Sequence, residues 1–418
     1  MGTNRICRSC ASGGLLGFLS LGPTPLTDAY VPPERAGQPE RRYPLDVAFC
    51  PNCTLVQIPA VVPPEAIFER YTYFSSFSDT LLSHSQEHVR QLIADRGLGS
   101  DDLVVEVASN DGYLLRYFVA QGIPVLGIDP ARGPADAAEA VGVPTLREFF
   151  GIDLASRLRS DGKAADVLIA NNVVAHVPDL NGFVEGIATI LSSDGVCEIE
   201  VPYVRELIER LEFDTIYHEH LCYFSVTALD ALFSRHGLSI DAVQLLPIHG
   251  GSLRSTIKRN GQRGPSVQHY LDEEADHGMH RFDYYARFAE RVTQVQGDLR
   301  EMLLRLHRQG KTVAAYGAAA KGTILLNSSG IGSDLIAFVA DTNPHKQGKL
   351  MPGVGIPIVA PERILESMPE YVVLLAWNIK DEILRKQRAY LESGGRFIIP
   401  IPSPVEVGLT EVEEVASG

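Results

Sequence analysis

Four cysteines near the start of the chain stand in two CxxC pairs, Cys7/Cys10 and Cys50/Cys53. Thiolates two residues apart can reach one metal ion from a single tight turn, and two such turns supply the four tetrahedral sulfur ligands that Zn²⁺ prefers in structural sites. Because four thiolates leave no position for an activated water, we expect the zinc to stabilise the fold and to take no part in chemistry. Two disulfides or redox-active CxxC motifs are the alternative, although nothing in the sequence marks an oxidising compartment.

A second group of reactive side chains occupies four consecutive positions, Tyr217, His218, Glu219 and His220. Histidine has an ordinary pKa of about 6.5 and can remove a proton near neutral pH, and a neighbouring Glu or Tyr can orient its ring. We therefore expect general acid–base chemistry here. Metal binding is one alternative, although the spacing lacks the i, i+4 pattern of HExxH, and structural histidines are another. His176 follows an expected strand, at the edge of an α/β sheet where ligands bind, with a structural role as its alternative.

The segment Glu106–Gly112 follows an apolar strand and precedes an expected helix. Compared with the ExGxGxG loop of methyltransferases, it keeps the acid and the last glycine but has Ala108 and Asn110 at the other two glycine positions. Asp129 closes the next strand, where a carboxylate can accept hydrogen bonds from both hydroxyls of a ribose. The loop lacks a glycine series for a pyrophosphate, which favours S-adenosylmethionine over a dinucleotide; an ordinary βα turn is the alternative. The expected cofactor contacts are Glu106, Ala108, Asn110, Gly112, Asp129 and Asn171.

The segment Tyr316–Gly322 also follows a strand and opens a helix, and Asp341 lies beyond it at the distance of the acid in a dinucleotide fingerprint. It matches GxGxxG except that Ala319 takes the central place. The central glycine lets the backbone approach a pyrophosphate, so a methyl group there disfavours NAD. Lys321 adds a cation beside a helix N-terminus, which favours a nucleoside diphosphate joined to something other than nicotinamide. A Rossmann-like unit without a ligand is the alternative.

Apolar runs of strand length follow a helix expected at Thr80–Arg96 and closed by Gly97. Runs without polar alternation fit strands buried on both faces, and helical stretches separate them, so we expect a doubly wound α/β domain with a parallel sheet. A turn or strand pair is expected at Gly250–Arg254. The expected strands of the sheet are Leu103–Val107, Val125–Ile128, Val167–Ala170 and Gly195–Val201.

A long amphipathic helix, ended by Gly310, is expected to precede a second α/β unit, and the acidic tail after Pro404 is expected to fray. The apolar face of that helix comprises Tyr285, Phe288, Val292, Val295, Leu299, Met302 and Leu306. The strands of the second unit are expected at Thr312–Tyr316, Ile336–Ala340, Tyr371–Ala376 and Arg396–Pro400. The expected domains are a zinc-binding module (1–70), a cofactor domain (71–265), a helical connector (266–309) and a second Rossmann-like domain (310–405).

Length and charge limit the possible functions. A chain of 418 residues is too long for one core, and a net charge of -15 argues against nucleic acid as a partner, since phosphate binding needs clustered cations. The apolar stretch Leu15–Leu21 is too short to span a membrane and lies between the two cysteine pairs. We expect a cytoplasmic protein that contacts neither membrane nor nucleic acid. The oligomeric state stays open, and a monomer is compatible with the sequence.

Taken in their order along the chain, these motifs together with His249–Arg254 resemble the nucleotide-sugar C-methyltransferases of deoxysugar and antibiotic biosynthesis. The resemblance implies an α/β enzyme with a zinc-binding N-terminal module, a Rossmann-like S-adenosylmethionine domain and a second Rossmann-like domain that helps to hold a dTDP-linked 4-keto sugar. By the same resemblance, the active-site group comprises Tyr71, His176, Tyr217, Glu219 and His220. The substrate contacts that it implies are Tyr217, His218, Arg254, Lys321 and Thr323.

The mechanism that the resemblance implies starts with loss of a proton from the carbon next to the C4 ketone, gives an enolate, and ends with transfer of the methyl group to carbon, with C3 favoured over C5. We expect His220 to be the base, with Glu219 and Tyr217 positioning it or the sugar. His176 or Tyr71 would donate a hydrogen bond to the developing oxyanion, a contact worth about 3–4 kcal/mol. An NAD-dependent nucleotide-sugar oxidoreductase is the alternative enzyme, and a non-catalytic zinc-ribbon adaptor is a third possibility.

Overall fold

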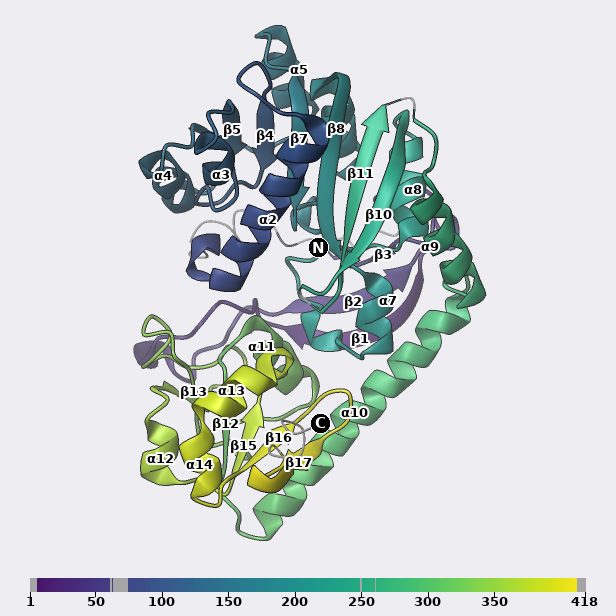
Figure 1. Cartoon of the computed structure of the whole chain (residues 1–418). Coiled ribbons are helices and arrows are strands. Elements are labelled where there is room, and N and C mark those ends of the chain that lie inside the picture. The colour runs from purple at the N-terminus through teal and green to yellow at the C-terminus, as the bar shows by residue number, and fades with distance from the viewer. Residues whose placement is uncertain (1–5, 61, 63–73, 249, 260, 412–418) are drawn as a thin grey trace.

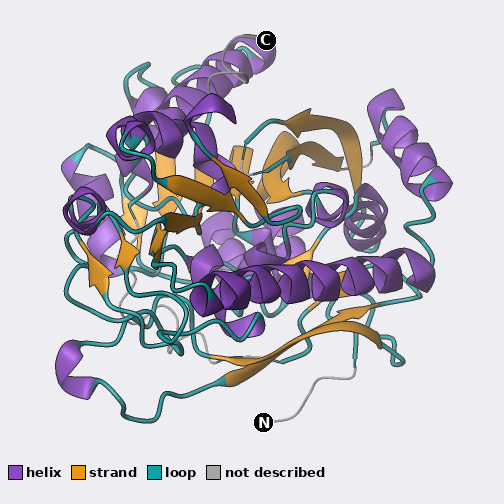
Figure 2. Cartoon of the chain, turned by 90° about the horizontal axis from the view of Figure 1, so that it is seen from below, coloured by secondary structure: helices purple, strands orange, loops and turns teal. Residues whose placement is uncertain are grey.

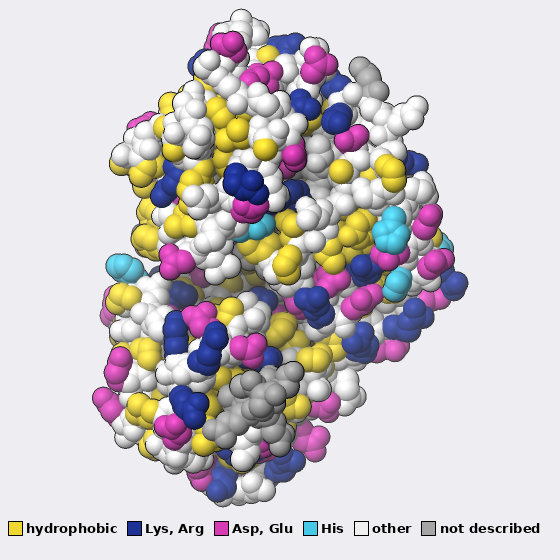
Figure 3. Space-filling model, in the orientation of Figure 1, with side chains coloured by type: hydrophobic (Ala, Val, Ile, Leu, Met, Phe, Trp, Pro, Cys, Tyr) yellow, Lys and Arg dark blue, Asp and Glu magenta, His cyan; other side chains and the backbone are white. Residues whose placement is uncertain are grey.

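The computed structural model describes residues 6–60, 62, 74–248, 250–259 and 261–411. Three sheets lie one after another along the molecule, with the N-terminal sheet between the two larger α/β units (Figure 1). On the face shown in Figure 3, acidic and basic side chains are interspersed, and the surface is indented between the upper and the lower unit. None of the described helices is long and apolar enough to cross a membrane.

The N-terminal sheet is antiparallel and joins two distant parts of the chain. Its strand order is β1-β2-β3-β9, so its last strand comes from the central part of the chain, directly after Tyr217–His220. The sequence did not indicate this pairing. The strands are β1 (Leu16–Thr24), β2 (Tyr43–Phe49), β3 (Val56–Gln57) and β9 (Cys222–Tyr223).

The central unit is the predicted doubly wound fold. Strands β4, β5, β6, β7 and β8 are parallel, with β11 and β10 added antiparallel at one edge, in the order β10-β11-β8-β7-β4-β5-β6. The predicted strand pair around the Gly250–Arg254 motif is the β10–β11 hairpin. The strands are β4 (Val104–Val107), β5 (Val125–Ile128), β6 (Thr145–Leu146), β7 (Ala165–Asn171), β8 (Leu191–Pro202), β10 (Leu238–Leu246) and β11 (Ser252–Arg259).

Helices cover both faces of the central sheet. One apolar cluster packs α2, α3 and α4 against one face, and a second cluster packs α5 and α6 against the other. Helix α2 ends as predicted, at Gly97 in the left-handed conformation, with φ of 65°. The helices are α2 (Asp79–Arg96), α3 (Leu115–Val119), α4 (Arg132–Ala140), α5 (Ile152–Ser160), α6 (Leu180–Ile190), α7 (Val204–Glu209), α8 (Val226–Ser234) and α9 (Pro265–Asp276).

The predicted amphipathic helix is α10 (Phe282–Arg308), which runs along one side of the molecule from the N-terminal sheet to the C-terminal unit (Figure 1). Figure 2 shows it alongside the N-terminal strands, where Tyr285 stacks on Phe49 at 4.6 Å between ring centres and contacts Phe18 at 5.4 Å. The residues predicted for its apolar face are buried, apart from Met302, which is only partly buried. Leu303, which was not predicted, is fully buried instead.

The C-terminal unit contains a sheet in the order β14-β13-β12-β15-β16-β17, parallel except for its last strand. The prediction of a frayed tail from Pro404 onward is wrong for its first residues, because β17 pairs with β16 and Glu411 accepts a hydrogen bond from the Gly408 backbone. The strands are β12 (Val313–Tyr316), β13 (Val339–Ala340), β14 (Ile358–Val359), β15 (Tyr371–Leu374), β16 (Arg396–Ile399) and β17 (Val405–Val407). The helices are α11 (Ala320–Ser328), α12 (Arg363–Ser367), α13 (Lys380–Lys386) and α14 (Arg388–Glu392). The exact domain boundaries stay predictions.

Candidate active site and zinc centre

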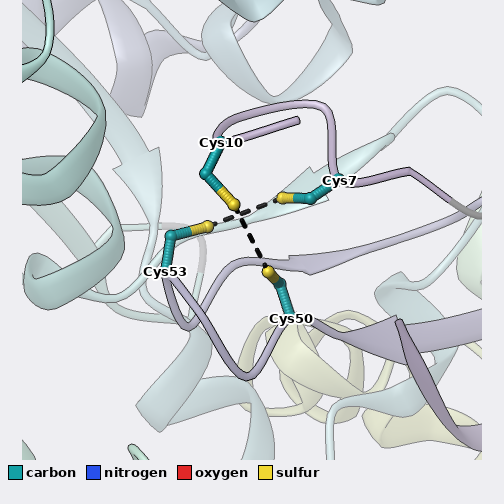
Figure 4. A group of neighbouring side chains, drawn as sticks. All are labelled: Cys7, Cys10, Cys50 and Cys53. Atoms are coloured by element: carbon teal, nitrogen blue, oxygen red, sulfur yellow. Dashed lines mark hydrogen bonds between the residues drawn. The ribbon is translucent and has the colours of Figure 1, made fainter. Parts of the chain in front are cut away.

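The four cysteines of the CxxC pairs converge on one point (Figure 4), with all four sulfur atoms within 4.8 Å of one another. Each pair forms the same tight turn, because Ala11 N–H donates to the Cys7 carbonyl at 3.0 Å and Thr54 N–H donates to the Cys50 carbonyl at 2.9 Å. Ala11 and Thr54 adopt φ angles of 58° and 61°, in the left-handed region. The two turns therefore present their thiols to a common centre as the spacing predicted.

The surroundings of the four thiols fit a zinc ion. The shortest sulfur–sulfur distances are 3.5 Å for Cys7–Cys53 and 3.6 Å for Cys10–Cys50, well beyond a disulfide bond of about 2.05 Å. The Gln57 amide donates a hydrogen bond to the Cys7 sulfur at 3.2 Å, as expected of the groups that orient metal ligands. Four sulfur ligands fill the coordination sphere, so the ion has a structural role.

The zinc module supports the reactive stretch Tyr217–His220 directly. Strand β3 pairs with β9, and Ile58 N–H donates to the Leu221 carbonyl at 2.9 Å. His218 turns away from the other members of the stretch and its Nε2 contacts the Tyr43 carbonyl at 3.2 Å. The ring is buried, and burial lowers its pKa, so His218 packs as a neutral residue. This placement is at odds with the expected substrate contact of His218.

A cavity of about 680 Å³ opens where β4, β5 and β7 end. Its lining includes four of the six predicted cofactor residues: Ala108, Asn110, Asp129 and Asn171. Ala108 and Asn110 have φ angles of 57° and 49°, so the loop keeps the left-handed conformation usually given by glycine although both positions carry a side chain. The substitutions in the ExGxGxG pattern therefore leave the shape of the loop intact.

Gly112 and Glu106 have roles other than lining the cavity. A Cβ atom at Gly112 would lie 3.0 Å from Val143 Cγ2, and φ is 71°, so this glycine is required by packing between the loop and its own unit. Glu106 is fully buried, and burial raises its pKa well above the usual range. A hydrogen bond with the Tyr113 side chain opposes this increase in the pKa of Glu106.

Asp129 braces the cofactor loop. Its carboxylate accepts hydrogen bonds from Asn110 N–H at 2.9 Å and from Ala131 N–H at 2.8 Å. The loop also holds the segment before α2, since Ser75 N–H donates to Asn110 Oδ1 at 2.9 Å. The buried acceptor Asn171 Oδ1 lacks a partner in the described chain. A large cavity lined by this acceptor and by the Asp129 carboxylate fits S-adenosylmethionine, which carries an ammonium group and a sulfonium cation.

The remaining wall of the cavity was not predicted. It comes from the loop after β6 and the start of α5, and includes Glu148, Phe149 and Phe150. Phe149 is 65% exposed although it is a large apolar side chain. No chemical signal in the sequence separated these residues from an ordinary loop, and only their folding back over the strand ends brings them to the site.

Three predicted active-site residues meet beside this cavity. His176 ends the short helix η3 (Val174–His176) after β7 and lines the cavity. Its ring contacts the ring of His220 edge-on, with 4.8 Å between centres, and His220 lies 4.1 Å from the ring of Tyr217. His220 Nδ1 lies 3.0 Å from the Thr215 carbonyl, which can only accept, so Nδ1 carries the proton and the lone pair of the neutral ring is on Nε2.

Burial shifts the pKa values of two predicted active-site residues, His176 and Glu219. It lowers the pKa of His176 to about 4, so that the ring is neutral at pH 7. Burial and, to a smaller extent, the negative charge of Asp28 together raise the pKa of Glu219 to about 7. The pair thus offers a neutral imidazole and a carboxyl group that titrates near neutral pH. Tyr71 lies outside the described residues.

The other expected substrate contacts lie in two units: Arg254 is in β11 of the central unit, and Lys321 and Thr323 are in α11 of the C-terminal unit. Arg254 is paired with Glu200 at 2.5 Å and contacts His84, within a buried charged cluster beneath α2. Thr323 is fully buried and its hydroxyl donates to the Thr27 carbonyl at 3.2 Å, so its observed role is packing between α11 and the N-terminal module. This burial is at odds with a direct contact between Thr323 and substrate. Lys321 lies above the ring of Trp377, with Nζ 4.9 Å from its centre.

The second loop is held by the same kind of acid as the first. Asp341 accepts a hydrogen bond from Ala318 N–H at 2.7 Å. The Ala318 carbonyl accepts from the Tyr30 hydroxyl at 2.6 Å and from Lys346 Nζ at 2.8 Å. Gly317 has φ of 93°, and a Cβ atom there would lie 2.9 Å from the side chain of Ala376. The close contact between this loop and the segment after β15 therefore explains why residue 317 is a glycine.

Three family models match the chain in the order of its three sheets. They are described as “Putative zinc binding domain” over residues 7–68, “Methyltransferase domain” over residues 81–243 and “C-methyltransferase C-terminal domain” over residues 247–402. The class of protein is therefore a methyltransferase with an added zinc module and a C-terminal α/β domain.

A more specific assignment comes from a similar protein. The C-methyltransferase NovU of Streptomyces niveus is 37% identical over 401 residues, which are 95% of this chain and 96% of that protein. The chain belongs to this family of S-adenosylmethionine-dependent C-methyltransferases. This finding leaves no support for an NAD-dependent oxidoreductase or for a non-catalytic adaptor.

Solved structures that match part of the chain are more distant. Magnesium protoporphyrin IX methyltransferase of Synechocystis with bound SAM is 15% identical, with a TM-score of 0.34, covering 47% of this chain and 89% of that one. A SAM-dependent methyltransferase of Anabaena variabilis is 14% identical, with a TM-score of 0.35, covering 47% of this chain and 91% of that one.

Proposed function

We propose that this C-methyltransferase acts on a dTDP-linked 4-keto-deoxysugar and methylates the carbon next to the C4 ketone, with C3 favoured. The observation that carries the proposal is the contact between His176, which lines the cofactor cavity, and His220, which has the tautomer of a general base. A carbon becomes nucleophilic only after a neighbouring ketone has allowed it to lose a proton. A methyltransferase for carbon therefore needs a base beside its methyl donor.

His220 is the proposed base. The Thr215 carbonyl fixes the proton on Nδ1, so Nε2 carries the lone pair that is proposed to accept a proton from the sugar carbon. The ring is half-buried and lies against Tyr217, which limits its rotation. Glu219 and Tyr217 would position the ring or the sugar. S-adenosylmethionine supplies, when bound, a methyl group made electrophilic by the sulfonium.

His176 is the proposed donor to the enolate oxygen. Its pKa is lowered to about 4, so it remains a neutral imidazole and does not compete with His220 for the proton. A neutral donor aimed at a developing oxyanion stabilises the transition state more than the ketone. Tyr71 is proposed to share this role on the basis of the resemblance alone.

The C-terminal unit is proposed to hold the nucleotide. Lys321 stands in the first turn of α11, at a helix N-terminus that favours anions, and Lys346 lies at the same loop. A diphosphate bound there would place the sugar toward the central unit. The substrate contacts of Lys321 and Arg254 are part of this proposal.

Incubation with labelled S-adenosylmethionine and a panel of dTDP-4-keto-deoxysugars tests the function. We expect the label to appear in one or a few of these sugars, on the carbon next to the ketone when the product is analysed by NMR. A label on oxygen or nitrogen, or no transfer to any 4-keto sugar while the protein binds S-adenosylhomocysteine, would contradict the proposed substrate class.

A further inference from the structure

The reactive stretch Tyr217–His220 is fixed at both ends. Beyond it, β9 pairs with the zinc module, and before it lies the short helix η4 (Phe213–Thr215). Helix η4 packs against α11 of the C-terminal unit and carries Thr215, whose carbonyl orients the His220 ring. The position of η4 therefore sets the position of the proposed base.

Asp214 is the central residue of η4 and joins it to the C-terminal unit. Its carboxylate is fully buried, and Oδ2 accepts a hydrogen bond of 2.7 Å from Nε1 of Trp377, in η5 (Trp377–Ile379). Its Oδ1 is also buried and has no partner within the described chain. Burying a carboxylate is costly unless it is hydrogen-bonded, so the Trp377 contact is what makes this placement of Asp214 tolerable.

Other charged groups lie close to the contact between Asp214 and Trp377, which we call the joint. Lys321 of α11 lies above the Trp377 ring, at 4.9 Å from its centre. Burial raises the pKa of Asp214 to about 6 and that of Glu212 to about 7, and the positive charge of Lys321 opposes both increases. Arg210 also lowers the pKa of Glu212, whereas Glu206 raises it. The joint thus gathers the buried acids Glu212 and Asp214 with the cations Lys321 and Arg210 at the boundary between two units.

The glycines of the Gly250–Arg254 motif belong to the same region. A Cβ atom at Gly250 would lie 2.4 Å from Glu212 Oε2, and one at Gly251 would lie 2.7 Å from Glu206 Cγ. Both residues have positive φ, so only glycine fits without strain. This hairpin turn closes over the acids that flank η4.

We infer that Asp214 and Trp377 are positioning residues for methyl transfer, because their hydrogen bond ties the C-terminal unit to the turn that orients His220. The inference rests on the proposed role of His220 as the base. It assigns to the C-terminal unit a second task besides holding the nucleotide, namely to fix the catalytic stretch of the central unit. Neither residue touches substrate in this account.

Trp377 is the only tryptophan of the chain, so its fluorescence reports on this joint alone. We expect the emission of the unsubstituted protein to change as the pH rises through about 6, where Asp214 loses its proton, and Asp214→Asn to remove that transition. Glu212→Gln should leave it in place. An unchanged transition in Asp214→Asn would show that the carboxylate does not contact the indole.

Kinetics of purified variants test the positioning role. Trp377→Phe keeps a ring beside Lys321 but removes the N–H donor, and Asp214→Ala removes the acceptor; both should lower kcat about tenfold to a hundredfold with the KM for S-adenosylmethionine unchanged. Asp214→Asn retains an acceptor oxygen and should keep most of the activity. Asp230→Ala, which removes another buried acid paired with Arg263, is the control and should lower stability without lowering kcat.

The outcomes separate the two proposals. If the unsubstituted enzyme exchanges no deuterium and transfers no methyl group to any 4-keto sugar, the proposed function fails, while fluorescence still tests the contact. If it is active and Trp377→Phe retains the full kcat, the positioning role is wrong. The kcat of Trp377→Phe tests the positioning role even if Asp214→Ala does not fold. An equal loss of activity in Asp214→Asn and Asp214→Ala would also overturn the inference.

Discussion

The two Rossmann-like units use the same hydrogen bonds to shape their first loops, but the loops face different surroundings. In the central unit, Asp129 accepts from the backbone N–H groups of Asn110 and Ala131. In the C-terminal unit, Asp341 accepts from those of Ala318 and Asn343. In both, an acid at the end of the second strand braces the turn after the first strand.

The two loops differ in the surroundings that they face. Ala108 and Asn110 line the cavity of about 680 Å³. The Ala318 carbonyl in the second loop is instead engaged by Tyr30 and Lys346. A loop of small residues followed by an acid therefore specifies a βα turn, whereas the residues that pack over the turn decide whether a cofactor can enter.

The largest expected effect concerns the catalytic group beside the first loop. His220→Asn should reduce methyl transfer by about a thousandfold and also abolish solvent deuterium exchange at the sugar carbon next to the ketone, since general-base catalysis contributes about 10²–10⁴-fold. Exchange is measured by NMR in D₂O with S-adenosylhomocysteine present.

His218→Asn is the matched control, two residues earlier in the same stretch. Its ring faces the Tyr43 carbonyl and is buried, so the substitution should change the unfolding midpoint more than the exchange rate. Undiminished exchange in His220→Asn would identify another residue as the base. Equal loss of exchange in both variants would mean that the stretch acts only as structure.

The second prediction compares the two bracing acids directly. Asp129→Ala should weaken S-adenosylhomocysteine binding about tenfold to a hundredfold, because it leaves the backbone N–H of Asn110 in the cofactor loop, and that of Ala131 after β5, without their acceptor. Asp341→Ala removes the equivalent bonds from the second loop and should leave that affinity unchanged. Thermal-shift titration with S-adenosylhomocysteine, and with NADH as a ligand that should not bind, measures both. Equal weakening in the two variants would contradict the assignment of one cofactor loop.

The sequence predicted the elements best where local chemistry determines structure. Gly97 ends α2 in the left-handed conformation, and β5 has the predicted bounds, because capping and continuous apolar runs are local signals. The CxxC spacing predicted the convergence of four thiols for the same reason.

Side-chain contacts with distant parts of the chain were not predictable in this way. His218 and Thr323 are both buried against the N-terminal module, which is distant from each of them in sequence. The pairing of β9 with β3 depends on the docking of that module, and nothing in the Cys222–Tyr223 dipeptide marks it as a strand. Tertiary contacts, and not local propensity, set these features.

The third prediction concerns the titration of Glu219, which belongs to the catalytic group beside the first loop. Burial raises its pKa from 4.5 to about 7 in the folded protein. Between these values the folded protein binds more protons than the unfolded chain, so this group makes the free energy of unfolding fall as the pH rises from about 4.5 to about 7, with no further change above that.

The free energy of unfolding of Glu219→Gln minus that of the unsubstituted protein should therefore be larger at pH 8 than at pH 5. Urea unfolding at the two pH values measures the difference, and Glu290→Gln, at an exposed site on α10, should show no such dependence. A difference between Glu219→Gln and the unsubstituted protein that is the same at both pH values would show that the carboxyl group is not buried as described.

The smallest expected effect concerns the loop backbones themselves. Ala108 holds φ of 57° with a side chain present, a conformation that costs about 1 kcal/mol and that glycine adopts freely. Ala108→Gly should raise the free energy of unfolding by about 0.5 kcal/mol after the greater entropy of glycine in the unfolded chain is included. Gly317→Ala should lower it, because φ is 93° and the new Cβ would lie 2.9 Å from Ala376 Cβ. Urea unfolding at pH 7 detects both signs. A destabilised Ala108→Gly would mean that the first loop keeps its shape through side-chain packing at residue 108, so the two loops would differ in what holds them as well as in what covers them.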